Sequence, residues 1–100
     1  MSRDETLREM VLGSTADDYE SFFYIQEQIG RWVKQRQIVE FTQDEIALKL
    51  ETLICSGHIR AYELSPKEPH SKVVDFIRDR LDEFWYLVTA EGLKEVKPQE

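Results

Sequence analysis

Apolar positions recur at helical spacing in the first half of the chain. Between residue 15 and Lys34 one helical face collects Tyr19, Phe22, Ile25, Ile29, Trp32 and Val33. Because a helix turns by about 100° per residue, this spacing predicts an amphipathic helix with one buried face. Thr15-Ala-Asp-Asp18 has the spacing of a capping box, with an acid at the third helical position, so we expect the helix to begin there.

A second helix is predicted after a short apolar run. Residues 38–41 are expected to form a short strand, and Thr42-Gln-Asp-Glu45 is a cleaner capping box that starts the next helix. That helix would bury residues spaced i, i+4, i+7 and i+8, namely Ile46, Leu50, Leu53 and Ile54. Ser56-Gly57 ends it, because glycine adopts a left-handed turn at low cost.

Two strands are predicted in the second half. Residues 59–64 alternate between apolar and polar side chains, which is typical of a strand. Residues 84–88 form a continuous apolar run, which predicts a strand covered on both sides. We expect the two strands to pair antiparallel.

The segments around the second strand predict a loop and two helices. The prolines of residues 65–70 predict a loop, since proline suits neither a sheet ladder nor a helix interior. Residues 71–83 are predicted to be helical, because one helical face would collect Val73, Val74, Ile77 and Leu81. Thr89 is expected to cap a last short helix that packs through Leu93 and Val96.

The ends of the chain are expected to be less ordered than its centre. Residues 1–14 could be a short docked helix or a loose arm, and we expect a partly ordered N-terminal arm. Residues 15–96 would then form one domain, and residues 97–100 a frayed tail.

Two motifs resemble those of the winged-helix superfamily. Leu53-Ile54-x-x-Gly57-x-Ile59 is similar to the junction where the last helix of such domains turns into the wing hairpin. Tyr86-x-Val88-Thr89-x-x-Gly92 is similar to the motif that closes the hairpin in PadR- and MarR-like bacterial regulators, with Val in place of Leu. The resemblance covers roughly residues 17–96. It implies an α+β fold in which helices pack on a small antiparallel sheet, with a helical insertion in the wing.

The chain departs from these regulators in the parts that they use on DNA. By resemblance, two helices and about 25–30 residues separate the short strand from the wing. Here Thr42 and Gly57 are close in sequence, so one helix of the helix-turn-helix pair is expected to be missing or merged. The wing, usually a short basic loop, is replaced by residues 65–83.

The charge balance bears on the kind of partner. The 100 residues include 20 acidic and 13 basic side chains, for a net charge of −7. DNA and anionic membranes are both bound through clustered Lys and Arg, so this balance disfavours both. The acidic N-terminus lacks the pattern of a signal peptide, and the lone Cys55 cannot form an internal disulfide. We therefore expect a cytoplasmic protein.

The helix after Thr42 is poorly suited to reading DNA. With its apolar stripe buried, it exposes Asp44, Glu45, Leu48, Glu51, Thr52 and Cys55. Base readout requires side chains such as Arg, Lys, Asn, Gln or Ser, and three acids would repel the phosphates. Specific duplex binding through this helix is not expected.

No motif predicts catalysis, a cofactor or a metal. Cys55-x-x-His58 has metal-like spacing, but no second pair follows, and His70 is the other histidine of the chain. Cys55 lies at the negative end of its predicted helix, which disfavours a thiolate nucleophile. The sequence contains no glycine-rich phosphate loop, so we expect a non-enzymatic protein.

Several apolar side chains fall on otherwise polar faces. Tyr24 and Leu48 lie nearly opposite the apolar stripes of their helices, and Phe23 and Phe76 lie at stripe edges. Several such residues on one small domain favour a partner surface or self-association. The sequence therefore predicts a winged-helix-like module for protein interaction or dimerisation, of the kind that an accessory regulator would use. The alternative, a DNA-binding transcriptional regulator, rests on fold analogy alone.

Overall fold

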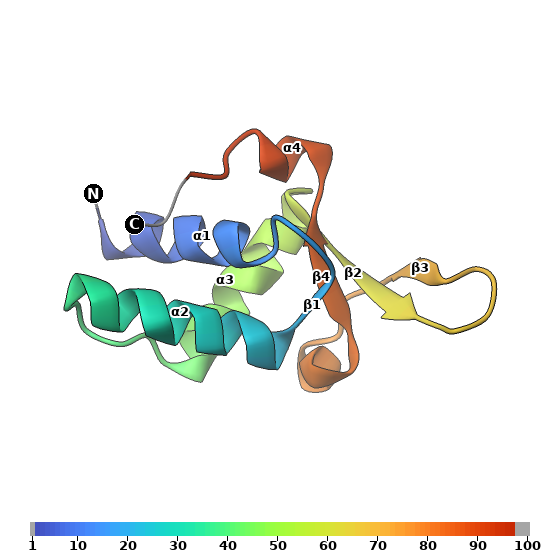
Figure 1. The fold of residues 1–100 in the computed structure, drawn as a ribbon, viewed down its shortest axis with the longest axis horizontal. Helices are drawn as coiled ribbons and strands as arrows, with labels where there is room; N and C mark the ends of the chain where they lie inside the picture. The colour runs from blue at the N-terminus through green and yellow to red at the C-terminus, as the bar shows by residue number, and fades with distance from the viewer. Residues whose placement is uncertain (1, 98–100) are drawn as a thin grey trace.

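Helices dominate the amino-terminal half of the computed structural model, which describes residues 2–97. The helices of that half are α1 (Arg3–Ser14), α2 (Phe22–Arg36) and α3 (Gln43–Cys55). An antiparallel sheet of order β1-β4-β2-β3 contains β1 (Glu20–Ser21), β2 (Ile59–Leu64), β3 (Ser71–Val74) and β4 (Trp85–Val88). A 3-10 helix, η1 (Arg78–Glu83), precedes β4, and α4 (Ala90–Leu93) follows it. The fold is therefore α+β, with α1, α2 and α3 on one side of the sheet (Figure 1).

The first residues form a packed helix and not the arm that the sequence suggested. Ser2 caps α1 by accepting a hydrogen bond from the Glu5 amide. Met10, Val11 and Leu12 are fully buried, and they join the core of α2, α3 and the sheet. A short segment that is largely polar in composition is thus ordered by the few apolar side chains that it buries.

The second helix begins later than the sequence predicted. Thr15 is the C-cap of α1, and its buried hydroxyl donates to the carbonyls of Val11 and Leu12. The helix that the sequence placed directly after Thr15 begins only at Phe22. Ser21 caps α2 instead, through a 3.1 Å hydrogen bond from the Tyr24 amide.

Residues 38–41 do not form the predicted strand. The Arg3 guanidinium donates to the carbonyls of Val39 and Glu40, at 2.9 and 2.7 Å, and so holds this loop against α1. The first strand is β1, where Glu20 pairs with Tyr86 of β4. Two helices, α2 and α3, therefore lie between β1 and β2.

The third helix follows its sequence signals closely. The Thr42 hydroxyl accepts from the Glu45 amide, and the Glu45 carboxylate accepts from the Thr42 amide, so the capping box is confirmed. Ile46, Leu50 and Leu53 are buried as predicted, and the partly buried Ile54 packs against the core. After α3, Gly57 adopts a φ of 82°, a left-handed conformation that few other residues adopt without strain.

The predicted pairing of the strands at 59–64 and 84–88 is confirmed, since β2 and β4 are antiparallel with Ile59 opposite Val88. The segment between them differs from expectation. Residues 71–74 form β3, which pairs with β2, and the helical part of 71–83 is reduced to η1. Val73 and Val74 are β-branched and suit a strand once β2 offers a partner, although their spacing also fits a helical face.

The end of the chain is partly as predicted. Thr89 caps α4 through a 3.1 Å hydrogen bond from the Gly92 amide, but Leu93 is largely exposed and only Val96 packs against the core. The predicted tail lies outside the described residues except for Lys97. Among residues 2–97, no helix is long and apolar enough to cross a membrane.

Candidate interaction surface

The outer face of the sheet carries apolar side chains that no helix within residues 2–97 covers. Because α1, α2 and α3 pack on the inner face (Figure 1), alternate residues of each strand point away from the core. On β2 the inward residues Ile59 and Ala61 are buried, and Tyr62 lies on the opposite face. The predicted double coverage of β4 is wrong for the same reason, since Tyr86 is fully buried and Trp85 is 39% exposed.

One row of side chains crosses three neighbouring strands on this outer face. Tyr62 of β2 is directly opposite Val73 of β3 on one side and Trp85 of β4 on the other. Val73 is 55% exposed, and Leu64, on the same face of β2, is also exposed. Side chains directly opposite each other in antiparallel strands lie about 5 Å apart, so the row forms one continuous apolar surface.

Tyr19 extends this surface from the loop before β1. Its ring packs edge-on against Tyr62, with 5.0 Å between the ring centroids, and its hydroxyl donates to the Ser71 hydroxyl of β3 at 3.2 Å. The loop is thereby fixed to the outer side of the sheet. We call the surface made by Tyr19, Tyr62, Leu64, Val73 and Trp85 the outer sheet face.

Two of the four predicted contact residues are exposed at the start of α2, the helix that follows β1. Phe23, 67% exposed, and Tyr24 stand in the first turn of α2. That turn is capped by Ser21, the residue opposite Trp85 in the sheet. The two side chains are therefore exposed directly after β1, and Phe23 lines a hollow along α2 with Glu27 and Lys34.

The other two predicted residues lie elsewhere. Leu48 is 56% exposed and lines a groove of about 460 Å³ between α1 and α3, whose other lining residues are Arg3, Asp4, Leu7, Phe41, Glu45, Lys49 and Thr52. Phe76 is half-buried and packs against the core, with its ring centroid 6.2 Å from that of Tyr86. Phe76 therefore offers less free surface than its sequence position suggested.

Sequence reasoning missed Trp85, Tyr62 and Val73. The available signal was that Tyr62 and Leu64 of β2 and Trp85 of β4, which alternate with buried positions, are themselves apolar. Val73 was assigned to a helix, so its place in the row depended on the pairing of β3 with β2.

Acidic side chains gather at the start of β1, an edge strand, where Glu20 is on the inner side of the sheet because it is opposite the buried Tyr86. Asp17 and Asp18 precede Tyr19, and Asp18 accepts a 2.7 Å hydrogen bond from the Tyr19 amide. Burial raises the pKa of Glu20, and the negative charges of Asp18 and Asp17 raise it further. The three carboxylates therefore repel one another at this border of the sheet.

The segment η1 contacts part of the outer side of α3, which stays exposed at Leu48 and Thr52. Arg78 of η1 pairs with Glu51 at 3.5 Å and donates to the Asp44 carbonyl at 3.4 Å. The segment η1 packs against α3 at this point. Two of the three acids that sequence reasoning placed toward DNA are on the helix side that this segment approaches, which leaves less of α3 accessible to a groove.

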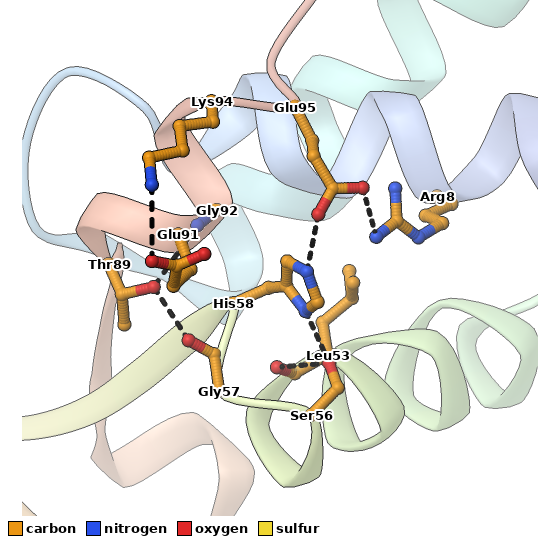
Figure 2. Close-up of polar contacts among 10 residues, drawn as sticks. All are labelled: Arg8, Leu53, Ser56, Gly57, His58, Thr89, Glu91, Gly92, Lys94 and Glu95. Carbon is orange, nitrogen blue, oxygen red and sulfur yellow. Dashed lines mark hydrogen bonds and ion pairs between the residues drawn. The ribbon is translucent and has the colours of Figure 1, made fainter.

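The motif Tyr86-x-Val88-Thr89-x-x-Gly92 is explained by packing where the end of β4 and α4 meet the turn after α3 (Figure 2). The Thr89 hydroxyl donates to the Gly57 carbonyl at 2.6 Å, while the Thr89 amide donates to the His58 carbonyl. A Cβ on Gly92 would lie 2.0 Å from the His58 carbonyl oxygen, so α4 can pack here only with glycine at this position. The motif thus attaches the end of β4 to the turn that follows α3.

His58 completes a polar cluster at the same junction. Figure 2 shows its imidazole between Ser56 and Glu95, and the Glu95 carboxylate also pairs with Arg8 of α1 at 2.7 Å. The hydrogen bond and charge of Arg8 lower the pKa of Glu95, with a smaller contribution from His58. The Ser56 hydroxyl also bonds the Leu53 carbonyl, as expected of a residue at the C-cap of a helix. These contacts join α1, α3 and the end of the chain.

The metal-like pair Cys55 and His58 is not brought together with further ligands. Within residues 2–97, no three His, Cys, Asp or Glu side chains are placed to share a metal ion. Comparison of the chain with known proteins found no matching family model, no similar curated protein and no similar solved structure.

Proposed function

We propose that this chain is a non-enzymatic, winged-helix-like module that binds another protein through its outer sheet face, as an accessory regulator in the cytoplasm. The observation that carries the proposal is the row Val73–Tyr62–Trp85, which is apolar, spans three strands and is covered by no helix of the described part of the chain. A continuous exposed apolar surface on a small domain is typical of an interaction site.

The order of elements supports the winged-helix-like part of the proposal. A helix, a short strand, two helices and a strand hairpin follow one another, as in the family that the motifs resemble. The hairpin of β2 and β3 extends away from the helices in Figure 1, in the manner of a wing. The 3-10 segment η1 then returns the chain to β4, which lies between β1 and β2.

The alternative function, DNA-binding transcriptional regulation, has weaker support. In the winged-helix interpretation α3 would be the recognition helix, yet Asp44 and Glu51 lie on its outer side and Arg78 packs there. Phosphate binding requires clustered cations, and the chain carries a net charge of −7. A protein partner therefore fits the surface better.

The test compares single serine variants at exposed apolar positions. Val73→Ser removes a side chain of the outer sheet face, Phe23→Ser removes an exposed predicted contact at the start of α2, and Leu93→Ser is a control of similar exposure at α4. We expect all three to unfold within about 0.5 kcal/mol of wild type, because each side chain is largely exposed. We expect only the first two to weaken association, by about 2 kcal/mol at the centre of an interface.

Association is measured as solution mass over a range of concentrations and as capture of purified candidate partners. The effect of Leu48→Ser on association tests whether the groove between α1 and α3 is the binding surface instead. If Leu48→Ser weakens association while Phe23→Ser and Val73→Ser do not, the outer sheet face is the wrong surface. If none of the variants changes any association, the interaction function is refuted.

A further inference from the structure

We propose that β3, the last strand of the sheet, pairs antiparallel with β3 of a second copy of this chain, about a twofold axis that passes between the two Val73 residues. The inference rests on the proposed interaction function and adds a partner and the strand edge that it uses. It is supported by the free backbone groups of β3, by the register that its side chains allow and by the apolar row that this register extends.

One side of β3 has no strand beside it. In the sheet order β1-β4-β2-β3 this strand is the last, and within residues 2–97 no other strand lies beyond it. Figure 1 shows the hairpin of β2 and β3 extending away from α1, α2 and α3. An open edge of this kind presents backbone N–H and C=O groups that pair readily with another strand.

The hydrogen-bond pattern of the sheet shows which residues of β3 face the open edge. One position beyond the last pair of β2 with β3, the Ser65 amide donates to the His70 carbonyl at 2.9 Å. Hydrogen-bonded and non-hydrogen-bonded pairs alternate along antiparallel strands. Ser71 and Val73 therefore direct their backbone N–H and C=O groups away from β2, toward the open edge.

The other side of β2 agrees with this assignment. One position beyond the first pair of β2 with β4, the Thr89 amide donates to the His58 carbonyl at 3.0 Å. The same alternation commits the backbone N–H and C=O of Tyr62 to Trp85. Tyr62 therefore has no backbone group left for Val73, its neighbour on β3.

A twofold axis perpendicular to the sheet limits how two copies of β3 can pair. Both copies then keep their helices on the same side of the joined sheet, so opposed residues must come from the same face of each copy. This condition requires one residue of β3 to be directly opposite its own equivalent.

The side chains of β3 favour Val73 as that central residue. Centring on Lys72 would place two like charges directly opposite each other. Centring on Val74 would place the Asp75 carboxylate opposite the apolar Val73. With Val73 at the centre, its free N–H and C=O bond those of its equivalent, and two valine side chains meet.

Ser71 supports the same register. If it were the centre, Pro69, which has no N–H, would be opposite Val73. With Val73 at the centre, Ser71 is instead opposite Asp75 of the second copy. The Ser71 hydroxyl accepts a hydrogen bond from Tyr19, so its own proton is available to that carboxylate.

This register joins the outer sheet faces of the two copies. The row Val73–Tyr62–Trp85 continues across the axis into the same three residues of the second copy. Lys72, opposite Glu63, is on the inner side of the sheet, so no charge interrupts the row. Contact between the two Val73 side chains, each 55% exposed in one copy, and the new backbone hydrogen bonds both favour the pair.

The first test removes the free N–H of Val73. Val73→Pro deletes this donor without removing a bond to β2, and proline is tolerated on an edge strand where the N–H faces solvent. We expect wild type to dimerise as its concentration rises, measured by sedimentation equilibrium. Val73→Pro should weaken the dimer by about tenfold or more, because two hydrogen bonds are lost per dimer.

Lys72→Pro is the matched control for that variant. The Lys72 amide faces β2, opposite Glu63, so proline at this position removes a bond inside one copy. We expect Lys72→Pro to melt at a lower temperature than Val73→Pro, measured by circular dichroism. The reverse order would show that the backbone of Val73 does not face the open edge.

Cysteine variants test the register without proline. In a Cys55→Ser background, which removes the lone cysteine, Val73→Cys places two thiols on directly opposed residues. Their Cα atoms would be about 5.5 Å apart, within the range of a disulfide. Lys72→Cys places the thiols on a diagonal of about 7–8 Å, beyond that range. In a glutathione redox buffer, we expect Val73→Cys to form a disulfide-linked dimer and Lys72→Cys to form far less.

Three results would overturn the pairing of β3 with a second copy. They are a wild type that stays monomeric at every concentration, a Val73→Pro variant that dimerises as wild type does, and equally fast disulfide formation by the two cysteine variants. A dimer that Trp85→Leu weakens and Val73→Pro does not would place the second copy on the outer sheet face, which also contradicts edge pairing.

The proposed function fails or stands separately. Trp85 is two strands from the open edge, so Trp85→Leu should leave dimerisation unchanged and weaken capture of a partner that binds the outer sheet face. If wild type is monomeric but Trp85→Leu weakens capture, the interaction function stands and the edge pairing is wrong.

Discussion

Gly92 lies where the His58 carbonyl approaches the first turn of α4 (Figure 2). An added Cβ would lie 2.0 Å from the His58 oxygen and 2.9 Å from its carbon, both backbone atoms that cannot move alone. We therefore expect Gly92→Ala to lower the free energy of unfolding by about 1–3 kcal/mol, measured in urea.

Gly30 supplies the control for that substitution. It is inside α2, and no atom lies within 4 Å of the place that an added methyl carbon would occupy, so Gly30→Ala should raise stability by about 0.5–1 kcal/mol. Changes of the same sign at both glycines would show that close packing on His58 is not what requires glycine at position 92.

Glu20 gives a pH-dependent prediction at the same scale. Because burial and the charges of Asp18 and Asp17 raise its pKa above the ordinary value of 4.5, folding opposes ionisation of this side chain. The ionised carboxylate therefore destabilises the fold near neutral pH, and this cost disappears as pH falls through the raised pKa. We expect Glu20→Gln to melt at a higher temperature than wild type at pH 7, with the difference shrinking toward pH 4. A constant difference across that range would exclude this cause.

At the scale of the elements, a core substitution in α1 tests whether the first residues belong to the domain. Leu12 is fully buried in the shared core, and Leu12→Ala should lower the free energy of unfolding by about 2–5 kcal/mol. Leu93→Ala, at a largely exposed position of α4, should change it by less than about 0.5 kcal/mol. Similar small losses in both variants would fit the loose arm that the sequence suggested.

Two similar capping motifs, at Thr42 and at Thr15, show that a local sequence pattern does not always determine where a helix begins. The Thr42 capping box sets the start of α3, because both of its hydrogen bonds are made within four residues. Thr15 is also followed by an acid three positions later, Asp18, but its hydroxyl donates to carbonyls of α1 instead. The sequence at residue 15 does not show which of two adjacent helices the side chain serves.

For the molecule as a whole, we expect no specific DNA binding through α3. Asp44 and Glu51 lie on the side of α3 that η1 approaches. Arg78 of η1 pairs with the Glu51 carboxylate and donates a hydrogen bond to the Asp44 carbonyl. Duplex titrations at about 150 mM salt should show no submicromolar binding, only weak binding that salt abolishes. Submicromolar binding that Thr52→Ala removes, while Thr6→Ala on α1 does not, would contradict this prediction.

Local patterns were sufficient to predict the helical or strand character of most of the chain. The α3 capping box, the Gly57 turn, the pairing partners 59–64 and 84–88, and the Thr89 cap were all predictable, because each depends on neighbours in sequence or on a clear apolar pattern. The exposure of Phe23, Tyr24 and Leu48 also followed from helical periodicity.

Which faces and segments come together depended instead on contacts between distant parts of the chain. The place of α1 in the core, the choice of strand for 71–74 and the row Val73–Tyr62–Trp85 all depend on such contacts. Val73 and Val74 fit a helical stripe and a strand equally well, and pairing with β2 made the difference. The sequence pattern shows that a residue is apolar, but the packing of α1, α2 and α3 on one side of the sheet determined which apolar residues remained outside.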